Sequence, residues 1–188
     1  MQSPQLVVRV TDRDHSLGPS NAPVTLVEYG DFECAHCARA HPIVQGIRRY
    51  MGEDLRFVYR HFPLTAGHPY AVRAAEVAEA AGAQGKFWQM LDALFRAQDA
   101  LDYEELLLHA ARIGVDARRV SRELIAHVFA AEVRDHLRGG IRSGVYGTPT
   151  FFINEMRYDG NWSDAAEFIQ VLSDAATSPA LGLRGPAT

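Results

Sequence analysis

Two short segments of the chain have the nearly unbroken apolar and β-branched character of buried strands. Residues 24–29 have the sequence VTLVEY, and residues 55–62 have the sequence LRFVYRHF. Such runs are typical of strands in the middle of a sheet. A loop rich in Gly, Pro and Asn at residues 18–23 precedes the first run, and residues 6–10 form a candidate edge strand before it.

The pattern becomes helical after each of these strands. Residues 34–50 predict one helix, which Pro42 is expected to kink because proline lacks an N–H donor and crowds the preceding turn. Residues 69–142 keep a helical period throughout, with Asp102 and Asp116 at positions that resemble helix starts. This second region predicts four or five helices.

The C-terminal part returns to strand character at residues 150–153, turns at residues 154–155 and pairs back over residues 156–158. A last helix is expected over residues 163–176, and the tail over residues 177–188 is expected to be disordered. The order is strand, helix, strand, helical block, strand, strand, helix. It favours an α/β fold with parallel central strands and an antiparallel final edge.

The length and charge of the chain narrow the range of folds and binding partners that we expect. A chain of 188 residues that is 47% hydrophobic can fill one core and an insertion. Its net charge of −4, without a long basic run, predicts neither a nucleic-acid nor a membrane partner. Residues 1–21 lack the basic and apolar regions of a signal peptide. If Met1 is the natural start, we expect a cytoplasmic protein; with a leader removed, the alternative is a periplasmic or extracytoplasmic one.

Only two cysteines are present, Cys34 and Cys37. A bond between residues so close in sequence would constrain little chain, so their expected use is chemical rather than structural. A strand-to-helix junction places Cys34 near a helix N-terminus, where free N–H groups and the helix dipole stabilise a thiolate. Cys34 is therefore the predicted nucleophile, and Cys37 lies within reach to resolve a mixed disulfide.

Three charged or ionisable neighbours bear on the pKa of Cys34. The ring of His36, between the cysteines, either favours the thiolate or faces solvent. Asp31 and Glu33 oppose the thiolate by their negative charge, but we expect them to be more exposed and therefore screened. The net prediction is a lowered pKa for Cys34.

Glu28 is an acid inside an otherwise apolar strand, on the face shared by Val24 and Leu26. A buried carboxyl group there would have a raised pKa and could exchange a proton with Cys37 as the disulfide opens and closes. The alternative is an edge-strand glutamate that points to water.

Three segments together resemble the DsbA-type branch of the thioredoxin superfamily: VEYGDFECAHC at 27–37, HPYA at 68–71 and GTPTFFIN at 147–154. The resemblance spans about residues 22–176. It implies a thioredoxin-like α/β fold with an all-helical insertion between two half-domains. The implied divisions are an N-terminal extension (1–21) with the candidate edge strand, a thioredoxin-like domain (22–64 and 143–176), a helical insertion (65–142) and a flexible tail (177–188).

The resemblance also implies the activity of a bacterial thiol-disulfide oxidoreductase. Its substrates would be protein or peptide thiols and disulfides, and an unidentified redox partner would reset the pair. No cofactor is expected beyond the Cys34–Cys37 disulfide, and no dimer module precedes Val24, which favours a monomer. The sequence leaves open whether the protein oxidises, reduces or isomerises its substrates.

The same resemblance assigns further site residues. It implies a cis peptide bond between Thr148 and Pro149, packed against the cysteines, with the backbone of Thr148 able to pair with an extended substrate. It favours Glu28 as a buried acid and His36 as a thiolate stabiliser. Ala35, also expected at the substrate, departs from the proline common in the family and makes the loop less rigid.

Two other classes of function compete with this interpretation. Cys34, His36, Cys37 and His41 could bind zinc or copper, but structural zinc sites usually take a second ligand pair from a separate segment. We therefore predict no metal site. The second alternative is a redox-switched adaptor whose helical block binds a partner. The other histidines are not spaced along the chain like the ligands of a metal site. Two of them, His61 and His68, could flank the thiol site, although surface or capping roles are the expected ones.

Overall fold

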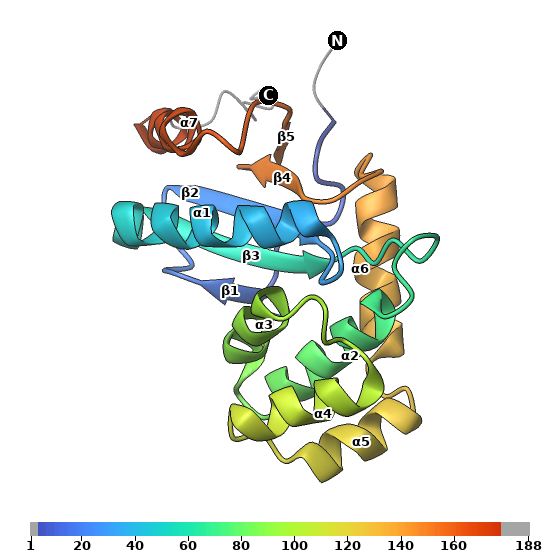
Figure 1. The fold of residues 1–188 in the computed structure, drawn as a ribbon. Helices are drawn as coiled ribbons and strands as arrows, with labels where there is room; N and C mark the ends of the chain where they lie inside the picture. The colour runs from blue at the N-terminus through green and yellow to red at the C-terminus, as the bar shows by residue number, and fades with distance from the viewer. Residues whose placement is uncertain (1–3, 178–188) are drawn as a thin grey trace.

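A computed structural model describes residues 4–177 and contains one five-stranded sheet with the order β1-β3-β2-β4-β5 (Figure 1). The two central strands, β2 and β3, are parallel, and the β1–β3, β2–β4 and β4–β5 pairs are antiparallel. This is the mixed sheet of a thioredoxin-like fold. The strands are β1 (His15–Leu17), β2 (Val24–Gly30), β3 (Leu55–His61), β4 (Thr150–Ile153) and β5 (Met156–Tyr158).

The two apolar runs of the sequence form the centre of this sheet. Val24 is opposite Leu55 and Gly30 is opposite His61, so β2 and β3 align over their whole length. Each strand is buried at six of its seven positions, because helices cover the two faces of the sheet. The predictions for these strands are confirmed, as is that for the final antiparallel pair.

The predicted edge strand at residues 6–10 is wrong. The edge strand is β1, which pairs with β3. In the segment before it, Leu6 is buried while Val7 and Val8 are largely exposed. The backbone N–H of Leu6 donates to the carbonyl of Glu155, and the N–H of Val7 donates to the Ser143 hydroxyl. The segment therefore buries the side chain of Leu6 and makes single hydrogen bonds to other segments instead of the regular ladder of a strand.

Two helices, α1 (Ala35–Met51) and α7 (Ala165–Thr177), pack on one another and against the central strands. Pro42 lies inside α1; the kink that we expect there stays a prediction. Apart from Thr177, the last residue of α7, the tail predicted to be flexible lies outside the described residues. A single 3₁₀ turn, Gly52–Asp54, connects α1 to β3.

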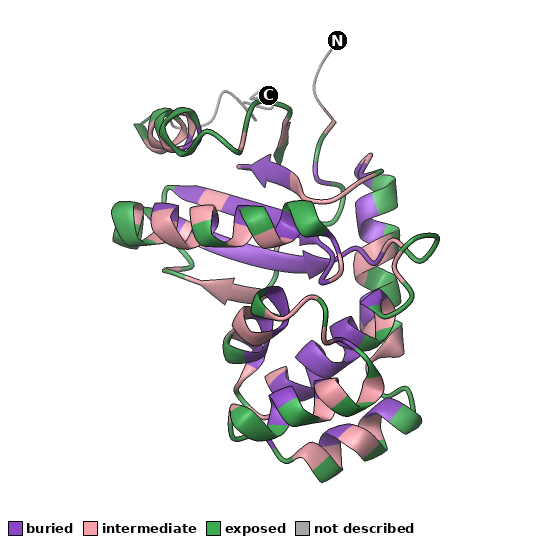
Figure 2. Cartoon of the chain, in the orientation of Figure 1, coloured by how far each residue is buried: buried purple, intermediate pink, exposed green. Residues whose placement is uncertain are grey.

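Five helices between β3 and β4 form the insertion predicted from the helical period (Figure 1). The side chains of Asp102 and Asp116 accept backbone N–H groups at the starts of α4 and α5, which confirms them as helix caps. Figure 2 shows α2 buried along most of its length, at the centre of this block. The helices are α2 (Ala71–Gly82), α3 (Phe87–Arg96), α4 (Tyr103–Arg112), α5 (Ala117–Ile125) and α6 (Ala130–Arg142).

The core is continuous between the sheet and the helical insertion. The larger apolar cluster joins α1, the sheet and helices α2 to α5, and it includes both cysteines. A smaller cluster covers the other face of the sheet, where Gly140 of α6 lies against the rings of Phe62 and Tyr29. The sulfur atoms are therefore held by the main core rather than by a surface loop.

Candidate active site

Cys34 and Cys37 lie where β2 gives way to α1. Cys34 is the N-cap residue of α1, and its extended backbone (φ −74°, ψ 116°) begins the helix. Only 6% of Cys34 and none of Cys37 is exposed. Both cysteines are unpaired thiols in this structure, and the Cys34 sulfur lies 3.3 Å from the carbonyl oxygen of Thr148. The structure thus represents a reduced pair at a helix N-terminus.

The surroundings of the two cysteines shift their pKa values in opposite directions. The hydrogen bond from the Cys37 thiol is the main cause that lowers the pKa of Cys34 to about 5, against the opposing effect of burial. A contact with Thr148 and the backbone N–H groups of Cys37 and His36 lower it further. Burial, followed by the hydrogen bond to Cys34, raises the pKa of Cys37 well above its ordinary value. The predicted direction for Cys34 is confirmed.

The ring of His36 takes a different position from the one expected of a thiolate stabiliser. It is exposed, and its Nδ1 lies 2.7 Å from the guanidinium of Arg39. Because arginine only donates, this nitrogen accepts the hydrogen bond. Among the hydrogen bonds of residues 4–177, none joins this ring to Cys34; His36 acts on the thiolate through its backbone N–H. A role for the ring itself stays a prediction.

Glu28 is buried in the central strand, not at an edge. Its neighbours across the sheet are Tyr59 and Phe151, and only 2% of it is exposed. Burial, and then the charge of Cys34, raise its pKa to about 8, so the carboxyl group is mostly protonated at neutral pH. Its Oε1 is a buried atom without a hydrogen-bond partner in the described part of the chain. Its charge also acts on the pKa of Cys37.

Asp31 is buried, which corrects the expectation that it is exposed and screened. It accepts hydrogen bonds from the backbone of Glu33 (2.8 Å) and Leu64 (2.7 Å) and lies 2.7 Å from Nδ1 of His68. Although burial of His68 opposes the effect, this contact with Asp31 raises the pKa of His68. The loop after β3 is thus fixed to the turn that carries Cys34, and His68 flanks the site.

Gln98 is a site residue that the sequence did not reveal. From the loop between α3 and α4, its side-chain amide donates to the carbonyl oxygens of Phe32 (2.6 Å) and Cys34 (3.0 Å). It connects the helical insertion to the turn before α1. No motif marks this glutamine, since its role depends on the packing of the insertion against the sheet.

Two of the three residues expected at the substrate, Thr148 and Pro149, line a cavity. The peptide bond between Thr148 and Pro149 is cis, and both residues are half-buried. They line a cavity of about 300 Å³ together with Tyr146 and Trp162. Ala35 is exposed at the start of α1. Substrate contacts by Ala35, Thr148 and Pro149 stay a prediction.

Among residues 4–177, the side chains considered as an alternative metal site do not come together as a group of ligands: Cys34, His36, Cys37 and His41. His41 lies 2.9 Å from Asp92, and the ring of His36 is bonded to Arg39. Within residues 4–177, the group of three metal-ligating side chains that come close together lies elsewhere: His61, Glu79 and His136. His61 is buried, so its expected surface or capping role is wrong.

A family model described as thioredoxin matches residues 10–171. The chain is also 45% identical over 173 residues to "Na(+)/H(+) antiporter NhaA 1" of Salinispora arenicola, a match that covers 92% of this chain and 26% of that protein. The chain therefore spans about a quarter of the length of this relative. No helix in the described part of the chain is both long and apolar enough to span a bilayer.

Solved structures with similar folds include oxidised BdbD from Bacillus subtilis, with a TM-score of 0.81, 21% identity and coverage of 94% of this chain and 98% of that one. A thioredoxin-like oxidoreductase from Silicibacter pomeroyi matches with a TM-score of 0.72 and 26% identity over 86% of this chain and 94% of that one. The α-DsbA1 protein of Wolbachia pipientis has a TM-score of 0.76 and 21% identity, covering 91% and 94%.

Replacing the Cys37 thiol tests what lowers the pKa of Cys34. We predict that Cys37→Ala raises the pKa of Cys34 from about 5 toward its ordinary value near 9.0, because the strongest hydrogen bond to the thiolate is lost. His36→Ala is the matched variant; it keeps the backbone N–H and should shift the pKa far less. The pH dependence of Cys34 alkylation, followed by mass spectrometry, measures both. A larger shift in His36→Ala would contradict this assignment.

The raised pKa of Glu28 predicts a pH-dependent stability. Between its ordinary value of 4.5 and about 8, the unfolded chain releases a proton that the folded protein keeps. The free energy of unfolding should therefore fall as pH rises through this range. Glu28→Gln should stabilise the protein at pH 8, with a gain that shrinks toward pH 4.5, whereas the exposed Glu53→Gln should not. Urea unfolding at several pH values measures this, and parallel curves for Glu28→Gln and the unmodified protein would refute it.

Proposed function

The chain belongs to the thioredoxin family and has the fold of DsbA-type proteins, and from this premise we propose that it exchanges disulfides with protein or peptide substrates through Cys34 and Cys37. The observation that carries the proposal is the placement of two unpaired cysteines at the start of α1, Cys34 as its N-cap residue and Cys37 fully buried. A thiolate on Cys34 and a protonated, fully buried thiol on Cys37 are the two states that an exchange cycle requires.

The exchange runs through a mixed disulfide. In the oxidised protein, a substrate thiolate attacks the Cys34 sulfur, the bond between the cysteines breaks, and Cys37 leaves as a thiolate that takes up a proton. A second substrate thiolate then attacks the substrate sulfur of the mixed disulfide, and Cys34 leaves as a thiolate. The substrate gains a disulfide and gives up two electrons, which the protein retains as its dithiol. No group beyond the two sulfurs is needed for this electron transfer.

The low pKa of Cys34 favours oxidation of the substrate. A thiol with a low pKa leaves readily, and interactions that stabilise its thiolate stabilise the reduced protein relative to the disulfide. The Cys37 hydrogen bond and the N–H groups of α1 act in this way. We therefore propose the direction of a disulfide donor, which a redox partner would reset.

Glu28 is the proposed proton carrier for Cys37. Its carboxyl group is buried, its charge influences the pKa of Cys37, and its own pKa of about 8 allows it to give or take a proton near neutral pH. Asp31 is less suited to this role because donors from Glu33, Leu64 and His68 already occupy its carboxylate.

We infer that the antiporter name of the relative describes parts of that protein outside the matched segment. The shared segment is about a quarter of that protein, and the thioredoxin model accounts for residues 10–171, nearly all of the segment. We propose that this quarter is a thiol-disulfide module and that it contributes the same exchange chemistry in the longer proteins.

Variants of the two cysteines distinguish their roles. Cys34→Ser should abolish insulin reduction and the oxidation of a dithiol peptide, because the attacking and attacked sulfur is lost. Cys37→Ser should still react once and accumulate a mixed disulfide at Cys34, detectable by mass spectrometry. Activity of Cys34→Ser equal to that of the unmodified protein would refute the assignment of Cys34 as the nucleophile. A single turnover by the unmodified protein would favour the alternative of an adaptor with a redox switch.

A further inference from the structure

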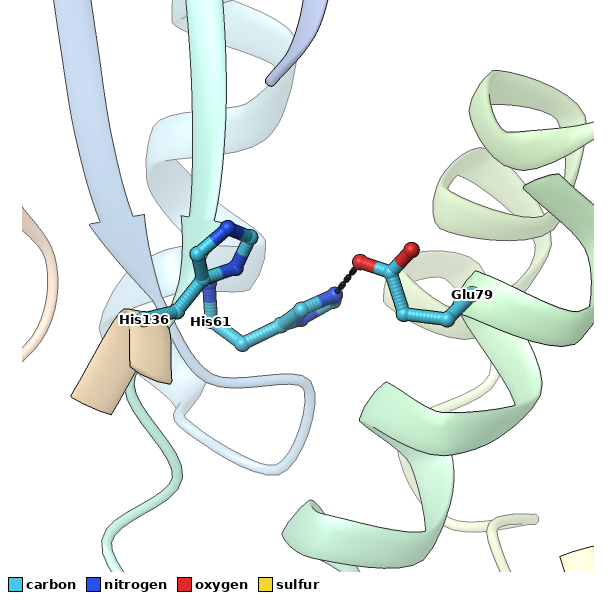
Figure 3. Close-up of side chains that lie close together, drawn as sticks. All are labelled: His61, Glu79 and His136. Atoms are coloured by element: carbon cyan, nitrogen blue, oxygen red, sulfur yellow. Dashed lines mark hydrogen bonds and ion pairs between the residues drawn. The ribbon is translucent and has the colours of Figure 1, made fainter. Parts of the chain in front are cut away.

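A second group of ionisable side chains lies between the sheet and the helical insertion. His61 ends β3, Glu79 projects from α2 and His136 projects from α6, and Figure 3 shows the three gathered at one place. One potential ligand atom from each residue lies within 4.8 Å of the other two. Only 1% of His61 and 3% of Glu79 is exposed. The thiol chemistry proposed above uses none of them.

Glu79 supplies a buried negative charge. Its Oε1 lies 2.7 Å from Nε2 of His61, and its Oε2 lies 2.7 Å from Nε2 of His15. Each oxygen of this buried carboxyl group therefore lies against a histidine ring. A bound cation is a further partner that such a buried carboxylate could take.

The two histidines have ring nitrogens available to a ligand. Nδ1 of His61 is buried without a hydrogen-bond partner in the described part of the chain. Nδ1 of His136 has only a long contact, 3.4 Å, with the backbone nitrogen of His61.

We propose that His61, Glu79 and His136 bind a divalent transition metal, with zinc the best match. Two imidazole nitrogens and one carboxylate oxygen are the donor set of zinc sites that keep a fourth position open. Bonds of about 2.0–2.2 Å place tetrahedral ligand atoms about 3.3–3.5 Å apart, whereas the ligand atoms of this group lie within 4.8 Å of one another, so ion binding requires the side chains to rotate. His15, on the second carboxylate oxygen, would orient Glu79.

His136 is the residue of the group that borders a cavity. This residue lines a cavity of about 740 Å³, together with Glu132 and Asp135 of the same helix. Three arginines line the same cavity, so its lining carries charges of both signs: Arg9, Arg13 and Arg60. Because the ligands come from β3, α2 and α6, the bound metal would link the sheet directly to the helical insertion and should stabilise their packing.

Zinc titration of a protein without cysteines isolates this site from the thiol pair. In the Cys34→Ser/Cys37→Ser chain, we expect one equivalent of Zn²⁺ by calorimetry and a higher Tm with zinc present. Loss of a residue that only hydrogen-bonds to a metal ligand weakens metal binding by about 10–100-fold. Because His136 is a proposed ligand itself, His136→Gln should weaken zinc binding by more than this. The matched control is His127→Gln, which alters another histidine–glutamate contact in the insertion, with Glu76, and should leave zinc binding unchanged.

A second measurement does not depend on the folding of a variant. Nitrogen NMR of the imidazole rings should show zinc-dependent changes at His61 and His136, with no change at His127. Absence of stoichiometric binding would overturn the proposal, as would equal losses in His136→Gln and His127→Gln or zinc-dependent changes confined to other histidines. In each case the three residues would form only a hydrogen-bonded clamp between the sheet and the insertion.

Discussion

The position of Cys34 at the N-terminus of α1, beside the fully buried Cys37, is the constraint on which the proposed chemistry depends. It places the negative charge on the residue at the N-terminus of α1 and keeps the proton on the fully buried one. The geometry requires a rigid turn between β2 and α1. Asp31 fixes one side of this turn to the loop after β3, and Gln98 fixes the other to the helical insertion. The insertion thus supports the site as well as the core.

The buried ionisable side chains of this core differ in whether their polar atoms have hydrogen-bond partners. Arg60 donates from Nε to Asp14 at 2.7 Å, and three donors reach the carboxylate of Asp31. Both arrangements satisfy their buried groups, as folded proteins generally do. Glu28 differs because one of its oxygens has no partner in the described residues and its pKa is strongly raised. An unpartnered acid beside a redox pair is the group expected to move protons.

The sequence predicted the elements whose signals are local. The apolar runs gave β2 and β3, the cap residues Asp102 and Asp116 marked α4 and α5, and the cysteine spacing located the start of α1. The edge strand was misplaced because its pairing depends on β3, which lies far along the chain. A short apolar run cannot show whether it will pair as a strand or merely anchor one side chain.

The position of the two cysteines at a strand-to-helix junction was predictable, and their surroundings were less so. The ring of His36 turns to Arg39, three residues on along the same helix, a local competition that the sequence analysis did not weigh. The burial of Asp31 depends on the loop that carries His68. The group of His61, Glu79 and His136 comes from three elements that only the fold brings together. Spacing along the chain contains no signal for such contacts.

The redox equilibrium of Cys34 and Cys37 with glutathione tests the central claim most directly. The protein is equilibrated in graded glutathione buffers, and the disulfide fraction is measured by alkylation and mass spectrometry. If the thiolate of Cys34 stabilises the reduced form, the potential should lie above the about −270 mV of thioredoxin, toward the about −120 mV of strong oxidants. A potential at or below the thioredoxin value would contradict the claim and indicate a reductase.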